Sequence, residues 1–238
     1  MPTAIEILGL NKSYGHIQAL RDLDLSINWG NVVAVFGPNG SGKTTLVKVL
    51  STLARPDFGI VRIAGLDPGK DHKQIHKQIG VLTHNTFLYS QLTVLENLQF
   101  YGRMFSVKNL PNRISSVCKI FRLTSYLDFK VSSLSHGFQK RVSLTRMLLH
   151  DPDILLLDEP ETGLDEEATM QLLELIKNHR AQGRMALITT HSLELGTGIA
   201  DKAIILVKGK VVLTNEGQEL DPVTFKNNYN FHTRTRIS

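Results

Sequence analysis

The sequence predicts an α/β fold with a mainly parallel sheet, an N-terminal antiparallel β subdomain and an inserted α-helical subdomain. Short apolar runs at 32–36 (VVAVF) and 154–157 (ILLL) are typical of strands that are buried on both faces, as in parallel sheets. Such strands alternate along the chain with segments of helical periodicity. Between about 88 and 150 the apolar spacing is helical throughout, so this block is expected to interrupt the sheet.

Residues 3–10 and 20–28 open the chain with alternating apolar and polar side chains, which predicts two half-exposed strands. The last stretch, 222–238, is polar and basic and is expected to be a loosely held tail after a single domain of residues 1–220. The elements expected between these ends are strand 32–36, helix 43–53, strand 59–63, helices from about 91 to 150, strand 154–157, helix 166–181, strand 185–190, a short helix after residue 191, and a hairpin of 203–207 with 210–214.

Length and composition are those of an ordinary globular protein. The chain has 238 residues, of which 42% are hydrophobic and 21% are charged. Its start lacks a secretory signal, and no run of 18 apolar residues is long enough to span a bilayer. The single cysteine, Cys118, cannot form an internal disulfide and is expected to be a small buried residue, which fits the reducing cytosol.

Basic charge is concentrated in one segment. Residues 86–150 hold nine Lys and Arg but two acidic residues, whereas the whole chain has a net charge of +5. Such a segment can meet nucleic acid, an anionic membrane surface or bound phosphate, or can be a solvated helical face. Its aromatic residues have the spacing of a helix core rather than of a base-stacking platform, so no nucleic acid is expected as a partner.

A phosphate-binding loop is predicted directly after the strand at 32–36. Residues 37–44 (GPNGSGKT) match the pattern G-x-x-x-x-G-K-[ST], whose glycines allow backbone N–H groups to turn toward phosphate oxygens. A helix that begins at Lys43 adds its positive end. Lys43 is expected to reach the β- and γ-phosphates and Thr44 to bind Mg²⁺. The ATP-binding residues expected here are Gly37, Pro38, Asn39, Gly40, Ser41, Gly42, Lys43, Thr44 and Thr45.

Two adjacent acidic residues end the second buried strand. Asp158 is expected to hold Mg²⁺, directly or through water, and Glu159 to polarise the attacking water. Two acids at a strand end before Pro160 can also be simple capping residues. Beside a phosphate loop, a P-loop NTPase core that hydrolyses ATP with Mg²⁺ becomes the better interpretation.

With these two sites placed, the chain resembles the ABC ATPase family over about residues 3–220. Residues 134–139 (LSHGFQ) are similar to the family signature LSGGQ, in which Ser135, His136 and Gly137 would contact the γ-phosphate held by the opposite subunit. His136 and Phe138 depart from the commonest form of the signature. The resemblance implies that two copies, identical or different, sandwich two ATP molecules, and that hydrolysis at Glu159 reopens the pair.

Three further positions take their roles from the resemblance alone. Tyr14 matches the aromatic residue that stacks on adenine, and His191 matches the switch histidine at the γ-phosphate, which makes it a catalytic residue. Asp165, in TGLD at 162–165, matches a residue at the dimer interface. Taken alone, His191 could be a structural histidine at a strand end and Tyr14 an ordinary surface aromatic residue. Five family motifs in the expected order favour their roles in nucleotide binding.

The chain departs from the family after the strand at 79–83, where His84 takes the place of a glutamine that links Mg²⁺ and water to the transporter subunit. A neutral imidazole can still accept a hydrogen bond from a Mg²⁺-bound water, which leads to the hypothesis that His84 is a relay in the coupling loop. A surface histidine without a role is the alternative. The stretches around His84 and the signature resemble the haem-exporter ATP-binding subunit of cytochrome c maturation, although other exporters share most of these residues.

The expected function is therefore an ATPase subunit that powers a membrane transporter, peripheral on the cytoplasmic side of the cell membrane. Its partners would be an integral membrane subunit and a second ATPase subunit. One rival is a soluble ABC protein that acts on nucleic acid or ribosomes, but such proteins usually have two cassettes or a long coiled coil, and this chain has one cassette and no heptad run. A P-loop GTPase or kinase is a further rival, disfavoured by the signature and by the lack of an NKxD-like motif.

Overall fold

The structure is a computed structural model that describes residues 3–217 and 221–234, and it confirms the predicted α/β fold. The larger sheet is six-stranded, with the order β5-β6-β7-β3-β8-β9, and all neighbouring pairs are parallel except β8 with β9. Its strands are β3 (Val32–Phe36), β5 (Ile79–Leu82), β6 (Ile154–Asp158), β7 (Met185–Thr189), β8 (Lys202–Val207) and β9 (Lys210–Glu216).

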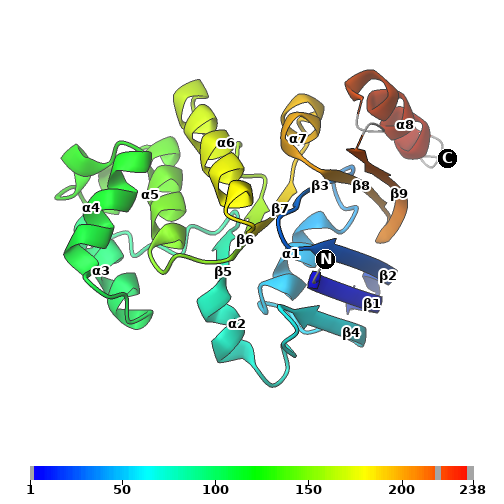
Figure 1. Cartoon of the computed structure of the whole chain (residues 1–238), viewed down its shortest axis with the longest axis horizontal. Helices are drawn as coiled ribbons and strands as arrows, with labels where there is room; N and C mark the ends of the chain where they lie inside the picture. The colour runs from blue at the N-terminus through cyan, green and yellow to red at the C-terminus, as the bar shows by residue number, and fades with distance from the viewer. Residues whose placement is uncertain (1–2, 218–220, 235–238) are drawn as a thin grey trace.

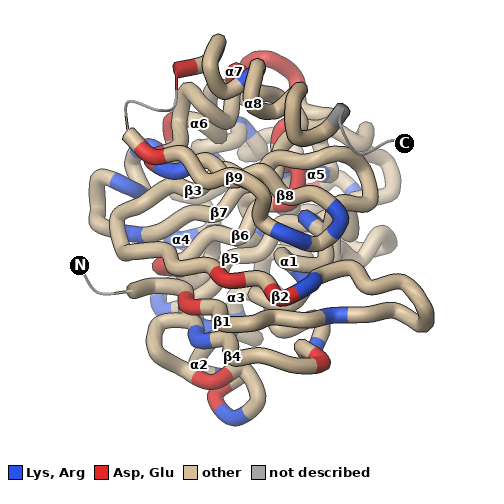
Figure 2. Tube along the Cα trace, turned by 90° about the vertical axis from the view of Figure 1, so that its right-hand side faces the viewer, with Lys and Arg blue, Asp and Glu red and all other residues tan. Residues whose placement is uncertain are grey.

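The smaller sheet is antiparallel, has the order β2-β1-β4, and consists of β1 (Thr3–Tyr14), β2 (Ile17–Asn28) and β4 (Phe58–Ile63). It lies below the larger sheet in Figure 2, and α1 (Lys43–Leu50) contacts both β6 and β2. Both β1 and β2 are longer than the sequence pattern predicts, because they continue as a hairpin to the Tyr14–Ile17 pair. The N-terminal antiparallel subdomain is thus present as predicted.

Alternate residues of the central strands enter different cores. Val33 and Val35 of β3 and Leu187 of β7 face the core shared with the small sheet, whereas Leu155 and Leu157 of β6 face the core shared with the helices. Successive side chains of a strand point to opposite faces, so both sets of positions must be apolar. This explains why β3 and β6 are continuous apolar runs in the sequence.

The helical subdomain is inserted between β5 and β6, as predicted, and lies to one side of the sheets in Figure 1. It contains α3 (Val94–Met104), α4 (Leu110–Ile120) and α5 (His136–Leu148). A capping box of Thr93 and Glu96 fixes the start of α3. The other helices of the core are α2 (His72–Gln78), which the sequence analysis did not predict, α6 (Glu166–Ala181) and α7 (Leu193–Ile199). Helix α1 ends earlier than expected because Thr52 has a left-handed φ of 61°.

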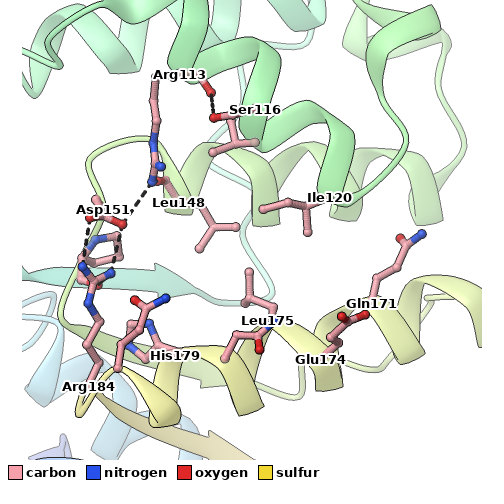
Figure 3. A pocket seen from close by; sticks show the side chains of 14 residues that line it. Arg113, Ser116, Ile120, Leu148, Asp151, Gln171, Glu174, Leu175, His179 and Arg184 are labelled. Carbon is pink, nitrogen blue, oxygen red and sulfur yellow. Dashed lines mark hydrogen bonds and ion pairs between the residues drawn. The ribbon is translucent and has the colours of Figure 1, made fainter.

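Asp151 joins the helical subdomain to the core (Figure 3). Its carboxylate accepts hydrogen bonds from Arg184, just before β7, at 2.9 Å and from Arg113 of α4 at 3.2 Å. Arg113 also donates to the carbonyl oxygens of Leu148 and Leu149 at the end of α5. A cavity of about 470 Å³ lies beside this network between α4 and α6. These polar contacts lie at the edge of the apolar cluster that α4, α5, α6 and β6 share, so the junction is held by both packing and ion pairs.

The expectation of a loosely held C-terminal tail is wrong for most of its length. Residues Pro222–Arg234 form helix α8, which packs on β8 and α7. Phe225 is fully buried, and its ring lies 4.8 Å from that of Phe36 in β3. Tyr229, one helical turn later, packs against the same cluster, so two aromatic residues in a polar segment hold the helix. The expected tail at 235–238 lies outside the described residues.

The first prediction concerns the anchoring of α8 by Phe225. Phe225→Ala should lower the free energy of unfolding by about 3 kcal/mol, because it leaves a cavity against Phe36. Urea denaturation followed by circular dichroism measures the change. The matched control is Phe231→Ala, which truncates a phenylalanine of the same helix that is 66% exposed, and should change stability by less than about 0.5 kcal/mol. Equal effects of the two variants would show that α8 is not anchored through Phe225.

Candidate functional site

Most of the predicted site residues lie where neighbouring parallel strands end. The strands β5, β6, β7 and β3 are adjacent in this order. Beyond their carboxyl ends come His84 after β5, Asp158 and Glu159 at the end of β6, His191 after β7, and the loop at 37–42 after β3. Parallel strands bring their carboxyl ends to one edge of a sheet, where α/β proteins bind ligands. The fold therefore gathers residues that are far apart in sequence.

The loop at 37–42 leads from β3 into α1 with a tight, glycine-dependent path. Gly42 has a φ of +111°, and a Cβ there would lie 2.5 Å from the carbonyl oxygen of Ala19 in β2. A larger residue would push the loop away from the small sheet. Because α1 begins at Lys43, its first amide groups have no partners within the helix and form the positive end of the helix dipole.

The Lys43 ammonium is held inside this loop. Its Nζ donates to the Gly37 carbonyl oxygen at 2.8 Å and lies 3.3 Å from His191 Nε2. Burial lowers the pKa of Lys43, while the charges of Glu159 and Asp158 oppose that shift. A buried cation among loop carbonyl groups is a site that a phosphate oxyanion would stabilise.

The carboxylate pair divides into two environments. The Asp158 side chain is fully buried, and its Oδ1 accepts a hydrogen bond from Thr189 Oγ1 at 2.6 Å. Glu159 is partly exposed, and its Oε1 lies 2.7 Å from His191 Nε2. Its backbone has a φ of 47°, unusual for a residue with a side chain, and its N–H donates to both oxygens of Thr189. The strained backbone directs Glu159 toward Lys43 and His191.

Asp158 and its neighbours fit a divalent cation. Within the described residues, Asp158 Oδ2 is buried and has no hydrogen-bond partner, although a buried carboxylate oxygen normally has one. His84 Nε2 lies 3.7 Å from this oxygen, at the open side of the site. A cation held by Asp158, with the Thr44 hydroxyl and phosphate oxygens as further ligands, would satisfy the orphaned oxygen, and such an oxygen-rich set suits Mg²⁺.

Within the described residues, no hydrogen bond joins the signature residues to the phosphate loop. Ser135 is the exposed N-cap of α5, where its hydroxyl accepts a hydrogen bond from the Phe138 N–H. His136 is also exposed. A Cβ at Gly137 would lie 2.9 Å from the Gly163 carbonyl oxygen, so this position requires glycine. Ser135 and His136 are thus solvent-exposed at the N-terminus of α5, where the positive end of a helix can bind an anion.

Tyr14 and Asp165 have different surroundings from the central residues. Tyr14 is 47% exposed on the hairpin of β1 and β2. The part of this hairpin that lies beside the phosphate loop is Ala19 and Leu20, next to Gly42. Asp165 is the N-cap of α6 and accepts two hydrogen bonds from Arg141. These contacts lower the pKa of Asp165, first through the Ala168 N–H and then through Arg141.

The sequence analysis missed the roles of two cations that connect α5 to the loop after β6 and to the start of α6. Lys140 Nζ donates to the carbonyl oxygens of Glu159 and Thr162, at 2.7 and 2.8 Å. Burial lowers the pKa of Lys140, partly offset by nearby acidic residues, and the Arg141 side chain is 6% exposed. Both residues stand out in the sequence only as two adjacent charges directly after the signature. Through Lys140, α5 is tied to the loop that contains Glu159.

Comparisons with known proteins agree with this geometry. Residues 20–162 match the family described as ABC transporter. The chain is 34% identical to the ABC transporter ATP-binding protein NatA of Bacillus subtilis, over 82% of this chain and 81% of that protein. It is 33% identical to the Nod factor export ATP-binding protein I of Rhizobium johnstonii, over 89% of this chain and 68% of that protein.

Solved structures of similar proteins extend the comparison. The ATP-binding subunit of an ABC transporter superposes with a TM-score of 0.86 at 26% identity, covering 95% of this chain and 94% of that chain. An ATP-binding cassette in a dimeric, post-hydrolysis state bound to ADP and Pi superposes with a TM-score of 0.82 at 26% identity, covering 89% of this chain and 98% of that chain.

The second prediction tests the connection through Lys140. Lys140→Met should lower the free energy of unfolding by about 1 to 2 kcal/mol, because two carbonyl oxygens lose a charged donor. It should also lower nucleotide hydrolysis, because the backbone of Glu159 loses its tie to α5. Lys119→Met, an exposed lysine on α4, is the matched control and should change neither quantity. Wild-type turnover in Lys140→Met would show that this tie has no part in the reaction.

Proposed function

This chain belongs to the ABC transporter family as an ATP-binding subunit, and we propose that it powers a membrane exporter whose translocation pathway is a separate polypeptide. It is an ATPase that uses Mg²⁺. The main support for the proposed roles in ATP binding and hydrolysis is that the side chains of Lys43, Glu159 and His191 meet at one point. One imidazole nitrogen lies 3.3 Å from the ammonium and 2.7 Å from the carboxylate.

In the proposed mechanism each of these groups acts on a different part of the substrate. Lys43 leaves the loop carbonyls for the β- and γ-phosphates and neutralises charge there. Glu159 accepts a hydrogen bond from the attacking water and polarises it. His191 lies between Lys43 and Glu159 and holds the carboxylate toward the γ-phosphate. Mg²⁺, held by Asp158 and Thr44, would offset the negative charge that develops on the phosphate oxygens.

Two subunits are needed for the complete site in this proposal. Ser135, His136 and Gly137 lie at the exposed N-terminus of α5 and would bind the γ-phosphate held by the partner, with Asp165 near the interface. ATP would then join two subunits, and its hydrolysis would separate them. The solved dimer of a similar cassette supports this arrangement. Tyr14 would stack on adenine at the edge of the same site.

The surface that fits a membrane subunit is a groove between the core and the helical subdomain. It has a volume of about 250 Å³ and contains no acidic residue among its lining. Its rim exposes large apolar side chains, with Leu53 54%, Met104 56% and Phe87 38% exposed. Exposed apolar groups of this size around one groove are typical of protein docking sites. The groove is lined by Ser51, Leu53, His76, Ile79, Val81, Phe87, Met104, Phe105, Arg146, Met147 and His150.

The basic charge of the helical subdomain favours this reading over nucleic-acid binding. Arg113, Lys140, Arg141 and Arg146 are bound to carboxylates or carbonyl oxygens of the chain itself. These four of the nine basic residues serve as internal ties and are not available to a polyanion, and Figure 2 shows acidic positions interspersed with basic ones elsewhere along the trace. Within the described residues no helix is long and apolar enough to cross a bilayer. A peripheral position on the cytoplasmic side of the membrane would follow from docking through the groove.

The loop at 83–87 links the nucleotide site to this groove. His84, at one end, lies beside Asp158, and Phe87, at the other, lines the groove. We propose this segment as the coupling loop, with His84 in the place of the usual glutamine. Movement of the loop on binding of nucleotide would reach the membrane subunit directly.

Export is the proposed direction of transport, and a small molecule is the proposed cargo. Similar proteins include a Nod factor export ATP-binding protein and a daunorubicin resistance ATP-binding protein from Streptomyces coeruleorubidus, which is 34% identical over 93% of this chain. Haem, in cytochrome c maturation, is the narrower proposal. It is supported only by the stretches around His84 and the signature, since the cargo site itself would lie in the membrane subunit.

The third prediction is that Glu159→Gln binds ATP normally but hydrolyses it at least about a hundredfold more slowly, because the water loses its base. Phosphate release measures the hydrolysis, and fluorescent nucleotide titration measures the binding. The variant should also accumulate an ATP-bound dimer, seen by light scattering after gel filtration. Near-normal turnover would assign the catalytic role to another group, with His191 the next candidate.

The fourth prediction concerns the signature. Ser135→Arg in the Glu159→Gln background should leave ATP binding intact but prevent the ATP-dependent dimer, because a large cation replaces the N-cap that meets the partner's phosphate. Ser132→Arg, three residues earlier and also exposed, is the matched control and should still dimerise. If Ser135→Arg dimerises with ATP as the control does, the sandwich arrangement is wrong.

The fifth prediction tests the groove. Met104→Glu should abolish co-purification of the membrane subunit when the tagged protein is pulled down from detergent-solubilised native membranes, because a charge replaces an exposed apolar contact. The ATPase activity of the isolated subunit should be unchanged. Met170→Glu on α6, where the side chain is 63% exposed, is the matched control and should remain with the membrane partner. Association of the wild-type protein with ribosomes or nucleic acid instead would favour the rival function.

A further inference from the structure

Strand β4 is an open edge of the small antiparallel sheet. It pairs with β1 on one side, and among the described residues no strand pairs along its other side. In Figure 1 it is the outermost strand of this sheet, and the loop after it leads to α2. At its end the chain turns back, and the Ile63 N–H donates to the Leu66 carbonyl oxygen at 3.0 Å. The rest of the edge is open to a further strand.

The backbone of Val61 faces this open edge. Groups two residues apart in a strand point the same way, so the N–H and carbonyl of Val61 share the direction of those of Ile63, away from β1. Ala64, an odd number of residues away, donates instead to Ala4 of β1 at 2.7 Å. Strand β4 therefore offers a donor and an acceptor to an added strand.

A groove of about 580 Å³ lies at this edge, between β4 and α2. Residues 59–62 of β4 line one wall, and His72 and His76, one turn apart on α2, line the other. The Nε2 atom of His76 lies 2.6 Å from Thr52 Oγ1, which fixes the imidazole in the wall. A groove between a strand edge and a helix has the shape that an extended peptide needs.

The groove is basic. Asp67 is the one acidic residue in its described lining, and its carboxylate is paired with Arg62 at 2.7 Å. Arg55, which also lines the groove, is exposed and has no ion pair among the described residues. Positive charge nearby comes from three exposed lysines on or just before α2, namely Lys70, Lys73 and Lys77. This charge favours an occupant with acidic side chains.

The outer face of β4 is apolar. Phe58 is 75% exposed and Ile60 is 51% exposed, and Leu8, which pairs with Ile60, is 49% exposed. On the inner face, Val61 packs in the same core as Ile75 of α2. A strand added along β4 would lay every second side chain over the apolar strip and turn the side chains between them toward α2 and the groove.

We propose that the groove between β4 and α2 binds an extended, acidic segment of a partner protein, which adds a fourth strand to the small sheet through Val61. Apolar side chains of this segment cover Phe58 and Ile60, and the alternating acidic ones lie near Arg55. The unpaired strand edge favours a peptide over a membrane surface or a nucleic acid, because these have no backbone N–H groups in a row. The inference does not depend on the proposed ATP site.

The test uses the full-length protein and a short, fluorescently labelled peptide of alternating glutamate and valine. Fluorescence anisotropy should show saturable binding, and hydrogen–deuterium exchange of residues 58–63 should slow in the complex. Of two versions N-methylated at alternate residues, one should bind about tenfold more weakly and the other nearly as well as the parent, because neighbouring N–H groups of a strand point in opposite directions.

Charge reversal tests the groove itself. Arg55→Glu should weaken binding of the peptide by about tenfold, whereas Arg103→Glu, at an exposed arginine of α3, is the matched control and should bind it as the wild type does. Equal binding by Arg55→Glu and the wild type, or equal binding of both N-methylated peptides, would overturn the inference. Binding of phosphatidylserine vesicles or a DNA oligonucleotide without binding of the peptide would also overturn it, and retained ATPase activity in that case would leave the proposed function intact.

Discussion

The parallel register of four strands is the constraint on which the site depends. Hydrogen bonding pairs Asp158 of β6 with Thr189 of β7, and Thr189 in turn with Val35 of β3. The ends of these strands are thereby level, so the phosphate loop, the carboxylate pair and His191 emerge at one edge. Thr189 then uses its side chain to position Asp158 and its backbone to hold Glu159 in a left-handed conformation. A one-residue shift of β7 would reverse the side of the sheet that Thr189 faces.

Much of this arrangement was predictable, because the strongest patterns are local. The apolar strands, the glycine-rich turn and helix 166–181 each depend on neighbouring residues, and the structure has all three. Helix α8 was missed because only Phe225 and Tyr229 of this polar segment pack on the core, and one pair at helical spacing is a weak periodic signal. The ties made by Lys140 and Arg141 were missed for a different reason. Their partners, Glu159, Thr162 and Asp165, lie 19 to 24 residues away, and a pair of adjacent charges does not indicate which distant groups it binds.

The helical subdomain shows how charge can serve structure in a basic segment. A surplus of Lys and Arg between 86 and 150 invites an interpretation in terms of an external anion. In the structure, several of these cations bind carbonyl oxygens at helix and strand ends, where no backbone donor is available. Arginine suits this purpose because it remains charged when buried and donates in several directions. One of them, Arg146, also lines the groove between the core and the helical subdomain, and the described lining of this groove has no acidic residue.

The helical subdomain is attached by two ion pairs of the same kind. Near the proposed nucleotide site the pair is Arg141 with Asp165, with side chains 6% and 61% exposed, and at the far end it is Arg184 with Asp151, with side chains 23% and 58% exposed. In each pair the carboxylate is open to solvent, so salt screens part of both interactions. A rise in ionic strength would therefore weaken both attachments together, whereas the apolar cluster shared by α4, α5 and α6 does not depend on salt and would keep the subdomain seated on the sheet.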